Sequence, residues 1–102
     1  MHGFTYQNFT PRKVFRHYAD FHLNLLAEKA PSDSIISAYA SKGDRGFIFD
    51  IRILSFAGLF ESSYEMTIPE AASDRLWQKE AIEKMSFDLE KQLRTWKNQR
   101  TV

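Results

Sequence analysis

Residues 47–55 read FIFDIRILS, and the pattern of this segment decides what the rest of the chain must supply. Its apolar residues stand at alternate positions from Phe47 to Ile53, with Asp50 and Arg52 between them. Side chains of a strand point alternately to opposite faces, so this segment is predicted to be a strand with one apolar and one polar face. A sheet built around it needs a covering layer on one side only.

Further strands are predicted on both sides of this segment. Ahead of it, residues 3–9 alternate, and residues 35–41 (IISAYAS) lead into a turn formed by SKGDRG. Behind it, residues 59–66 (LFESSYEM) follow a turn and place Phe60 and Tyr64 on the same side. The chain is therefore expected to contain four strands.

A first helix is predicted between the first two strands. It is expected to begin at Thr10-Pro11, because a Thr side chain can cap a helix and Pro suits the first helical position. It is expected to end near Lys29, ahead of Pro31. Its apolar residues at helical spacing are Val14, Tyr18, Phe21 and Leu25.

A second helix is predicted at the end of the chain, after a loop over residues 67–74. Ser73 or Asp74 is the expected cap, and the helix is expected to reach about Gln99. Residues 81–97 (AIEKMSFDLEKQLRTWK) give it one continuous apolar stripe, formed by Ile82, Met85, Leu89, Leu93 and Trp96.

The predicted order of elements is β-α-β-β-β-α, in a single domain that covers residues 1–102. A helix between the first two strands makes them parallel if they are neighbours, and short turns make the later strands antiparallel. Both helices carry one apolar stripe, so both must cover the same sheet face. The expected fold class is α+β: a two-layer sandwich of a four-stranded mixed sheet with two helices on one face.

The composition fits a globular protein of the cytoplasm. Hydrophobic residues make up 43% of the chain and there is no cysteine, so disulfides and cysteine-bound metals are excluded. No signal peptide is recognisable, and no apolar run approaches the ~20 residues that span a bilayer, so no membrane association is expected. Trp77 and Trp96 stand in or near the apolar stripe and are expected to fill the core or close its ends.

The sequence contains no catalytic or metal-binding constellation. Its serines have no recognisable base partner, and it has no Gly-rich phosphate loop or nucleophile elbow. His17 and His22 are five residues apart, which points them about 140° apart on a helix, whereas zinc-binding pairs favour one-turn spacing. The protein is therefore not expected to be an enzyme, or to hold a metal or another cofactor.

Positive charge is concentrated in two segments, although the net charge is only +1. Neither segment contains an acidic residue; the first holds Arg12, Lys13, Arg16 and His17, and the second holds Lys91, Arg94, Lys97 and Arg100. Cations at the start of a helix oppose its dipole, so the first cluster favours a functional explanation. Cations at the end of a helix complement the dipole, so the second cluster is open to a structural or an RNA-binding interpretation.

With this order of elements, the chain resembles the ribosome hibernation factors, the family of hibernation-promoting factor and ribosome-associated inhibitor A. The resemblance extends over about residues 3–99. Residues 9–21 (FTPRKVFRHYADF) are similar to the family's Thr-x-[AL]-[LI]-[RK] helix start after a short first strand. Residues 81–84 (AIEK) and 89–94 (LEKQLR) are similar to its closing helix, at the same spacing.

The resemblance implies a fold similar to the double-stranded-RNA-binding domain and a function as a short, bacterial-type hibernation factor. Proteins of this family bind the small ribosomal subunit in the channel for messenger and transfer RNA, contact ribosomal RNA through basic residues of both helices, and stop translation under stress. The resemblance implies RNA contacts by Arg12, Arg16, Lys84, Lys91, Arg94 and Lys97. Lys13 belongs to the same basic cluster as Arg12 and Arg16 and is included among the expected contacts. Recognition would be of phosphates and shape, with no base code.

An alternative without RNA binding stays open: a protein-interaction module, or a homodimer, that uses the open sheet face or the edge of the fourth strand. Asp88 favours this alternative, because the family usually has a lysine at that position of the closing helix. Phe56, beside the Ala57-Gly58 turn, is a further candidate contact for a partner.

Overall fold

The computed structural model describes residues 2–73 and 76–100 of the 102-residue chain. In chain order the elements are β1 (Thr5–Gln7), α1 (Lys13–Lys29), β2 (Ile35–Lys42), β3 (Gly46–Ser55), β4 (Gly58–Thr67), α2 (Ile68–Ser73) and α3 (Trp77–Arg100). The predicted order β-α-β-β-β-α is confirmed, with one short helix, α2, added before the last one.

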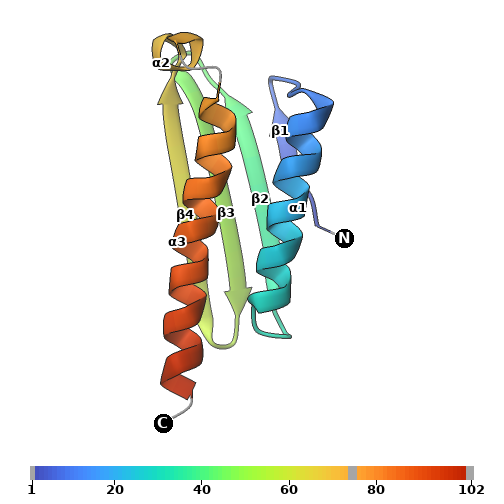
Figure 1. Cartoon of the computed structure of the whole chain (residues 1–102), viewed down its shortest axis with the longest axis vertical. Coiled ribbons are helices and arrows are strands. Elements are labelled where there is room, and N and C mark those ends of the chain that lie inside the picture. The colour runs from blue at the N-terminus through green and yellow to red at the C-terminus, as the bar shows by residue number, and fades with distance from the viewer. Residues whose placement is uncertain (1, 74–75, 101–102) are drawn as a thin grey trace.

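The four strands form one mixed sheet in the order β1-β2-β3-β4. β1 pairs parallel to β2, whereas the β2–β3 and β3–β4 pairs are antiparallel, as predicted. Figure 1 shows α1 and α3 on the same face of the sheet, both starting at the end of the molecule where α2 lies. The predicted two-layer α+β sandwich is therefore confirmed.

The core lies between the sheet and the two long helices. β3 forms its centre: Phe49, Ile51 and Ile53 are at most 1% exposed, and they pack against buried residues of both helices. Asp50 and Arg52, which alternate with them, form an ion pair on the opposite side of the sheet. The period-2 pattern of FIFDIRILS thus separates a buried face from an open face, as predicted.

α3 buries the stripe that its sequence predicts, since Ile82, Met85, Leu89 and Leu93 are at most 3% exposed. Trp77, the first residue of the helix, packs near Phe47 and Phe49, with ring centroids 4.6 and 5.5 Å away. Trp77 is therefore a core residue, as predicted, whereas Trp96 at the other end of the helix is only half-buried.

α1 differs from its prediction in its start and in its buried face. Arg12, and not Thr10, is the N-cap, and it makes no side-chain capping bond. Val14 and Phe21 of the predicted stripe are 82% and 60% exposed; the buried residues are Ala19, Leu23 and Leu26. Two apolar stripes run along this helix about 140° apart. The sheet covers the stripe in which the small side chain of Ala19 lets the helix approach closely.

A short helix, α2, follows β4 where the sequence predicts a loop. Thr67 and Glu70 cap it reciprocally: the Glu70 amide donates to Thr67 Oγ1 (3.3 Å), and the Thr67 amide donates to Glu70 Oε2 (3.1 Å). This capping box starts the helix, and Pro69 is tolerated within the first turn. Ser73 ends α2 by donating to the Glu70 carbonyl (2.9 Å) and so does not cap α3, while the other expected cap, Asp74, lies outside the described residues.

Candidate nucleic-acid interface

The first basic cluster stands at the start of α1. Arg12, Lys13 and Arg16 are exposed, and the first turn contains no acidic residue. Within residues 2–73 and 76–100, none of these three side chains forms an ion pair. Cations at this helix end oppose the dipole by roughly 0.3–1 kcal/mol each. This cluster therefore opposes the helix dipole, and an external anion would offset that cost.

Arg16 is held against the first strand. Its guanidinium carbon lies 5.4 Å from the centroid of the Tyr6 ring, which is within cation–π range. Burial raises the pKa of Tyr6 to about 12; the charge of Asp20 adds to the rise, and Arg16 acts against it. Because Tyr6 is neutral over the physiological range, it presents Arg16 with an aromatic face and no negative charge.

Lys84 and Lys91 lie on the side of α3 that faces β4. They are seven residues apart, so they share one face of the helix. Lys84 Nζ lies 5.7 Å from the centroid of the Tyr64 ring. Asp88, which stands between the two lysines, accepts a hydrogen bond from Gln92 Nε2 (3.2 Å). Its carboxylate is thus partly engaged within the helix, although it still lowers the local positive potential.

Arg94 and Lys97 lie near the end of α3, beyond the last turn of α1. Together with Lys29 they line a pocket at that end of the helix layer. Lys29 is engaged across the helices, because its Nζ pairs with Glu90 Oε1 at 2.8 Å. Arg94 and Lys97 form no such pair with any described residue. Within the described part of the chain, this end of the layer therefore carries two cations that have no carboxylate partner.

The two clusters lie on one layer but at opposite ends of it, because α1 and α3 run in the same direction (Figure 1). Tyr18 Oη donates to Glu83 Oε1 (2.5 Å), which shows where the two helices are level. Arg12 stands six residues before Tyr18, and Lys97 stands fourteen after Glu83. At 1.5 Å per residue these ends are roughly 30 Å apart.

The seven predicted contacts are therefore not one compact patch. The order of elements carried a signal for this separation: each long helix runs antiparallel to the strand before it, and β1 and β4 both point the same way as β2. The two helices must then be parallel to each other. The start of one and the end of the other cannot meet.

Charge is divided between the two long helices and the rest of the chain, although the chain as a whole is nearly neutral. α1 with its N-cap and α3 together contain ten cations and six carboxylates, counted from the sequence. The rest of the chain contains four cations and seven carboxylates. The helix layer is thus net positive and the remainder net negative.

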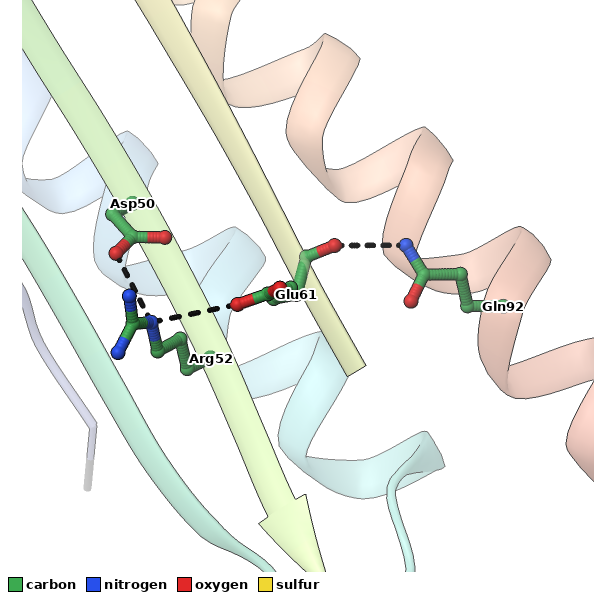
Figure 2. A network of polar contacts seen from close by, with 4 residues as sticks. All are labelled: Asp50, Arg52, Glu61 and Gln92. Atoms are coloured by element: carbon green, nitrogen blue, oxygen red, sulfur yellow. Dashed lines mark hydrogen bonds and ion pairs between the residues drawn. The ribbon is translucent and has the colours of Figure 1, made fainter. Parts of the chain in front are cut away.

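The open face of the sheet carries charges that are paired with one another. Figure 2 shows Arg52 between two carboxylates: its Nε lies 3.2 Å from Asp50 Oδ2 and 3.6 Å from Glu61 Oε2. Gln92 of α3 reaches the edge of the sheet, where its Nε2 donates to the Glu61 carbonyl (2.9 Å). This contact covers part of the free edge of β4.

An apolar row crosses the open face beside these charges. Ile35 is in register with Leu54, and Leu54 with Leu59, and all three are more than 50% exposed. Phe56, in the β3–β4 turn, is 101% exposed, and its amide donates to Asp33 Oδ2 (2.8 Å). The sequence predicts the exposure of Phe56 but not the apolar row. The row could have been predicted from the strand alternation, because Leu54 is an odd number of residues from Ile51 and Ile53 and so points to the opposite face.

Among residues 2–73 and 76–100, no three His, Asp or Glu side chains are grouped so that they could hold a metal ion. In the same part of the chain, no helix is long and apolar enough to cross a membrane.

Comparison with known proteins gives no family for the chain. No protein-family model matches it, and no curated protein matches it. The resemblance to hibernation factors therefore rests on residues 9–21, 81–84 and 89–94 and on the order of the elements.

Proposed function

We propose that the protein binds RNA of the small ribosomal subunit through its helix layer and thereby inhibits translation, as a hibernation factor does. The observation that carries this proposal is the division of charge: ten cations and six carboxylates on the two long helices and the N-cap of α1, against four and seven elsewhere. A surface that is positive on one layer only suits a partner that is contacted from one side.

The spacing of the cations favours folded RNA. Two clusters roughly 30 Å apart on the helix layer would contact two separate stretches of phosphate backbone at once. Shape recognition of double-stranded RNA works in this way, with contacts to successive grooves and the phosphates between them. Such binding needs no base code, which is consistent with a contact set made of Lys and Arg. Ribosomal RNA in particular is suggested by the family resemblance.

Co-sedimentation with purified small subunits tests the proposal. We expect the protein to pellet with subunits at about 50 mM salt and to be released by about 200 mM, because each phosphate contact releases counterions. The double variant Arg16→Glu plus Lys91→Glu should bind at least tenfold more weakly. A matched control, Lys42→Glu plus Arg45→Glu, makes the same charge change outside the helix layer and should bind like the wild type.

Two results would count against the proposal. One is a protein that stays in the supernatant at the lower salt concentration. The other is an equal loss of binding in both double variants, which would show that net charge matters and the helix layer does not. Inhibition itself is measured in a cell-free translation reaction, where the wild type should reduce product and the Arg16→Glu plus Lys91→Glu variant should not.

The apolar row supports a second candidate, self-association through the open sheet face. A second copy fits this face, because a row of exposed Ile35, Leu54 and Leu59 is complementary to itself and the neighbouring Arg52 is already paired within the face. The edge of β4 is less suited, since Gln92 covers part of it. Sedimentation equilibrium should show a dimer that Leu54→Lys dissociates. A monomer at all concentrations would exclude this candidate.

A further inference from the structure

α3 extends past the end of α1, and this difference in length creates a pocket. α1 ends at Lys29, and the chain turns back toward β2 through Ala30 and Pro31. Figure 1 shows that α3 continues beyond this turn to the end of the molecule. A concave pocket of about 590 Å³ lies there, between the end of α1 and the last turns of α3. Its volume lies within the range of small-molecule sites.

The pocket has an apolar and aromatic floor. Pro31 and Leu93 are buried, and the half-buried Trp96 completes the lining. The indole lies edge-to-face near the Phe60 ring, at a centroid distance of 6.3 Å and an interplanar angle of 70°. The apolar stripe of α3 therefore ends in an aromatic residue that packs against the core and also lines this pocket.

The rim of the pocket is positive. Arg94 and Lys97 stand on it and have no ion-pair partner among residues 2–73 and 76–100. The two carboxylates of the lining are Glu90, which is paired with Lys29, and Glu28. An aromatic floor below a cationic rim suits a ligand with a flat ring and an attached anion. A nucleotide has this composition.

We propose that this pocket receives one unpaired nucleotide of the bound RNA, with its base against Trp96 and its phosphate near Arg94 and Lys97. This inference rests on the proposed function and adds a position at which the RNA must be single-stranded or bulged. Unpaired bases stack on aromatic side chains regardless of their identity, so the pocket need not read sequence. Glu28 and Ser32 offer acceptors to the amino groups of a base.

The pocket also gives the two basic clusters different roles. The cluster at the start of α1 consists of exposed cations, so it is suited to backbone phosphates. The end of α3, roughly 30 Å away, takes a base as well as its phosphate. A bound RNA would therefore present a continuous backbone to one end of the helix layer and an unpaired residue to the other.

Binding measurements on Trp96 variants separate stacking from charge. Trp96→Leu should weaken subunit binding about tenfold, the usual scale for loss of one base–aromatic stack. It should leave the slope of log affinity against log salt unchanged, because no phosphate contact is lost. Trp96→Phe should restore most of the affinity. Urea unfolding of both variants shows whether loss of the Phe60 contact has disturbed the fold.

Fluorescence provides a second, independent measurement. The chain has two tryptophans, and Trp77 is buried between Phe47 and Phe49, so a Trp77→Phe background leaves the signal of Trp96 alone. The probe is a short RNA duplex with one bulged adenosine, and its control carries an abasic residue at the bulge. We expect quenching and about tenfold tighter binding with the base present.

The outcomes distinguish the pocket from the function. If Trp96→Leu binds subunits like the wild type while Arg16→Glu plus Lys91→Glu fails to bind, the pocket is empty and the proposed function stands. If the wild type does not bind subunits, the proposed function is overturned. In that case equal quenching by the bulged and abasic duplexes, or none by either, overturns the pocket as well.

Discussion

The two faces of the sheet are made by the same strands, but one is buried under the helices and the other is exposed to solvent. Along β3, Phe49, Ile51 and Ile53 are enclosed by the helices, while Ile48 and Leu54 on the other side are about half exposed. The covered face specifies the fold, and its covering layer has an outer surface of its own that is net positive. On the open face, Arg52 is paired with carboxylates and one row of apolar side chains is exposed. The comparison shows that the core is formed by only one side of the sheet and one side of each long helix, which leaves the other sides available for partners.

The largest expected difference between the faces is in stability. Phe49→Ala should lower the free energy of unfolding by about 3–5 kcal/mol, because Phe49 is 0% exposed and its removal leaves a cavity. Ile48→Ala, one residue away on the open face, should cost less than about 1 kcal/mol. Urea denaturation followed by circular dichroism measures both. Similar losses for the two variants would mean that the open face is covered in solution.

The next difference is in the salt dependence of RNA binding. Lys91→Gln plus Arg94→Gln, on the helix layer, should weaken subunit binding about tenfold and reduce the salt slope by roughly 1.5. Arg45→Gln plus Arg52→Gln removes the same charge outside the helix layer and should change neither quantity. Titrations at four or more salt concentrations give the slopes. An equal reduction by both pairs would remove the distinction between the faces.

Alkaline pH should act on the covered side through Tyr6. Burial raises its pKa to about 12, above the value of 10.0 expected in the unfolded chain. The folded state therefore favours the neutral phenol, so this stability is intact below pH 10 and falls as the pH rises toward 12. The loss should be about 1 kcal/mol, because solvent still reaches part of the ring. Urea unfolding midpoints across this interval measure it.

Tyr6→Phe is the matched variant. The Tyr6 hydroxyl is buried and has no hydrogen-bond partner among the described residues. Its removal should leave the protein equally stable or up to ~1 kcal/mol more stable at neutral pH, and should reduce the alkaline loss. Tyr18, whose pKa is also raised to about 12 by burial and then by its hydrogen bond to Glu83, should account for a remaining part. Tyr39→Phe on the open face serves as the control, and a greater alkaline loss in Tyr6→Phe would contradict this assignment.

The smallest expected effect concerns the ion pair between the helices. Glu90→Gln should lower the free energy of unfolding by no more than about 0.5 kcal/mol, because Lys29 and Glu90 both retain contact with solvent. The same change removes a negative charge from the rim of the pocket, so RNA binding should become up to about threefold tighter. Glu61→Gln on the open face should have a similar effect on stability and none on binding. Weaker binding by Glu90→Gln would show that the carboxylate itself contacts the RNA.

The parts of the fold that could be predicted from sequence are those set by local periodicity. The alternation in FIFDIRILS and the single stripe of α3 each leave one choice of buried face. α1 does not, because it carries two stripes, and only the sheet decides between Val14 and Ala19. α2 is too short to show a period, and its signal was the capping box formed by Thr67 and Glu70.

The candidate site was predicted less completely, for a different reason. The cations of the candidate site can be read directly from the sequence, and Arg12, Arg16 and Lys91 are exposed, as RNA-contacting residues must be. The pocket exists because α3 extends beyond the end of α1, on the side of the molecule where both helices end. That is a relation between two distant elements, and no local pattern around Trp96 encodes it.

The brevity of β1 has a consequence for the order of assembly. β1 is three residues long, and it joins β2 only after the chain has passed through the whole of α1. Strands β2, β3 and β4 follow one another through short turns, so their pairing closes smaller loops and costs less entropy. We expect β1 and the first turn of α1 to dock last during folding and to open first in the native state.

Amide hydrogen exchange should therefore be fastest in β1 and at the start of α1, and slowest in β3. Equal protection of β1 and β3 would contradict this order. Arg12 and Arg16 stand on the segment that we expect to open first. RNA bound to these arginines would hold this segment in its folded conformation. Slower amide exchange in β1 and at the start of α1 would then show that RNA is bound to the helix layer.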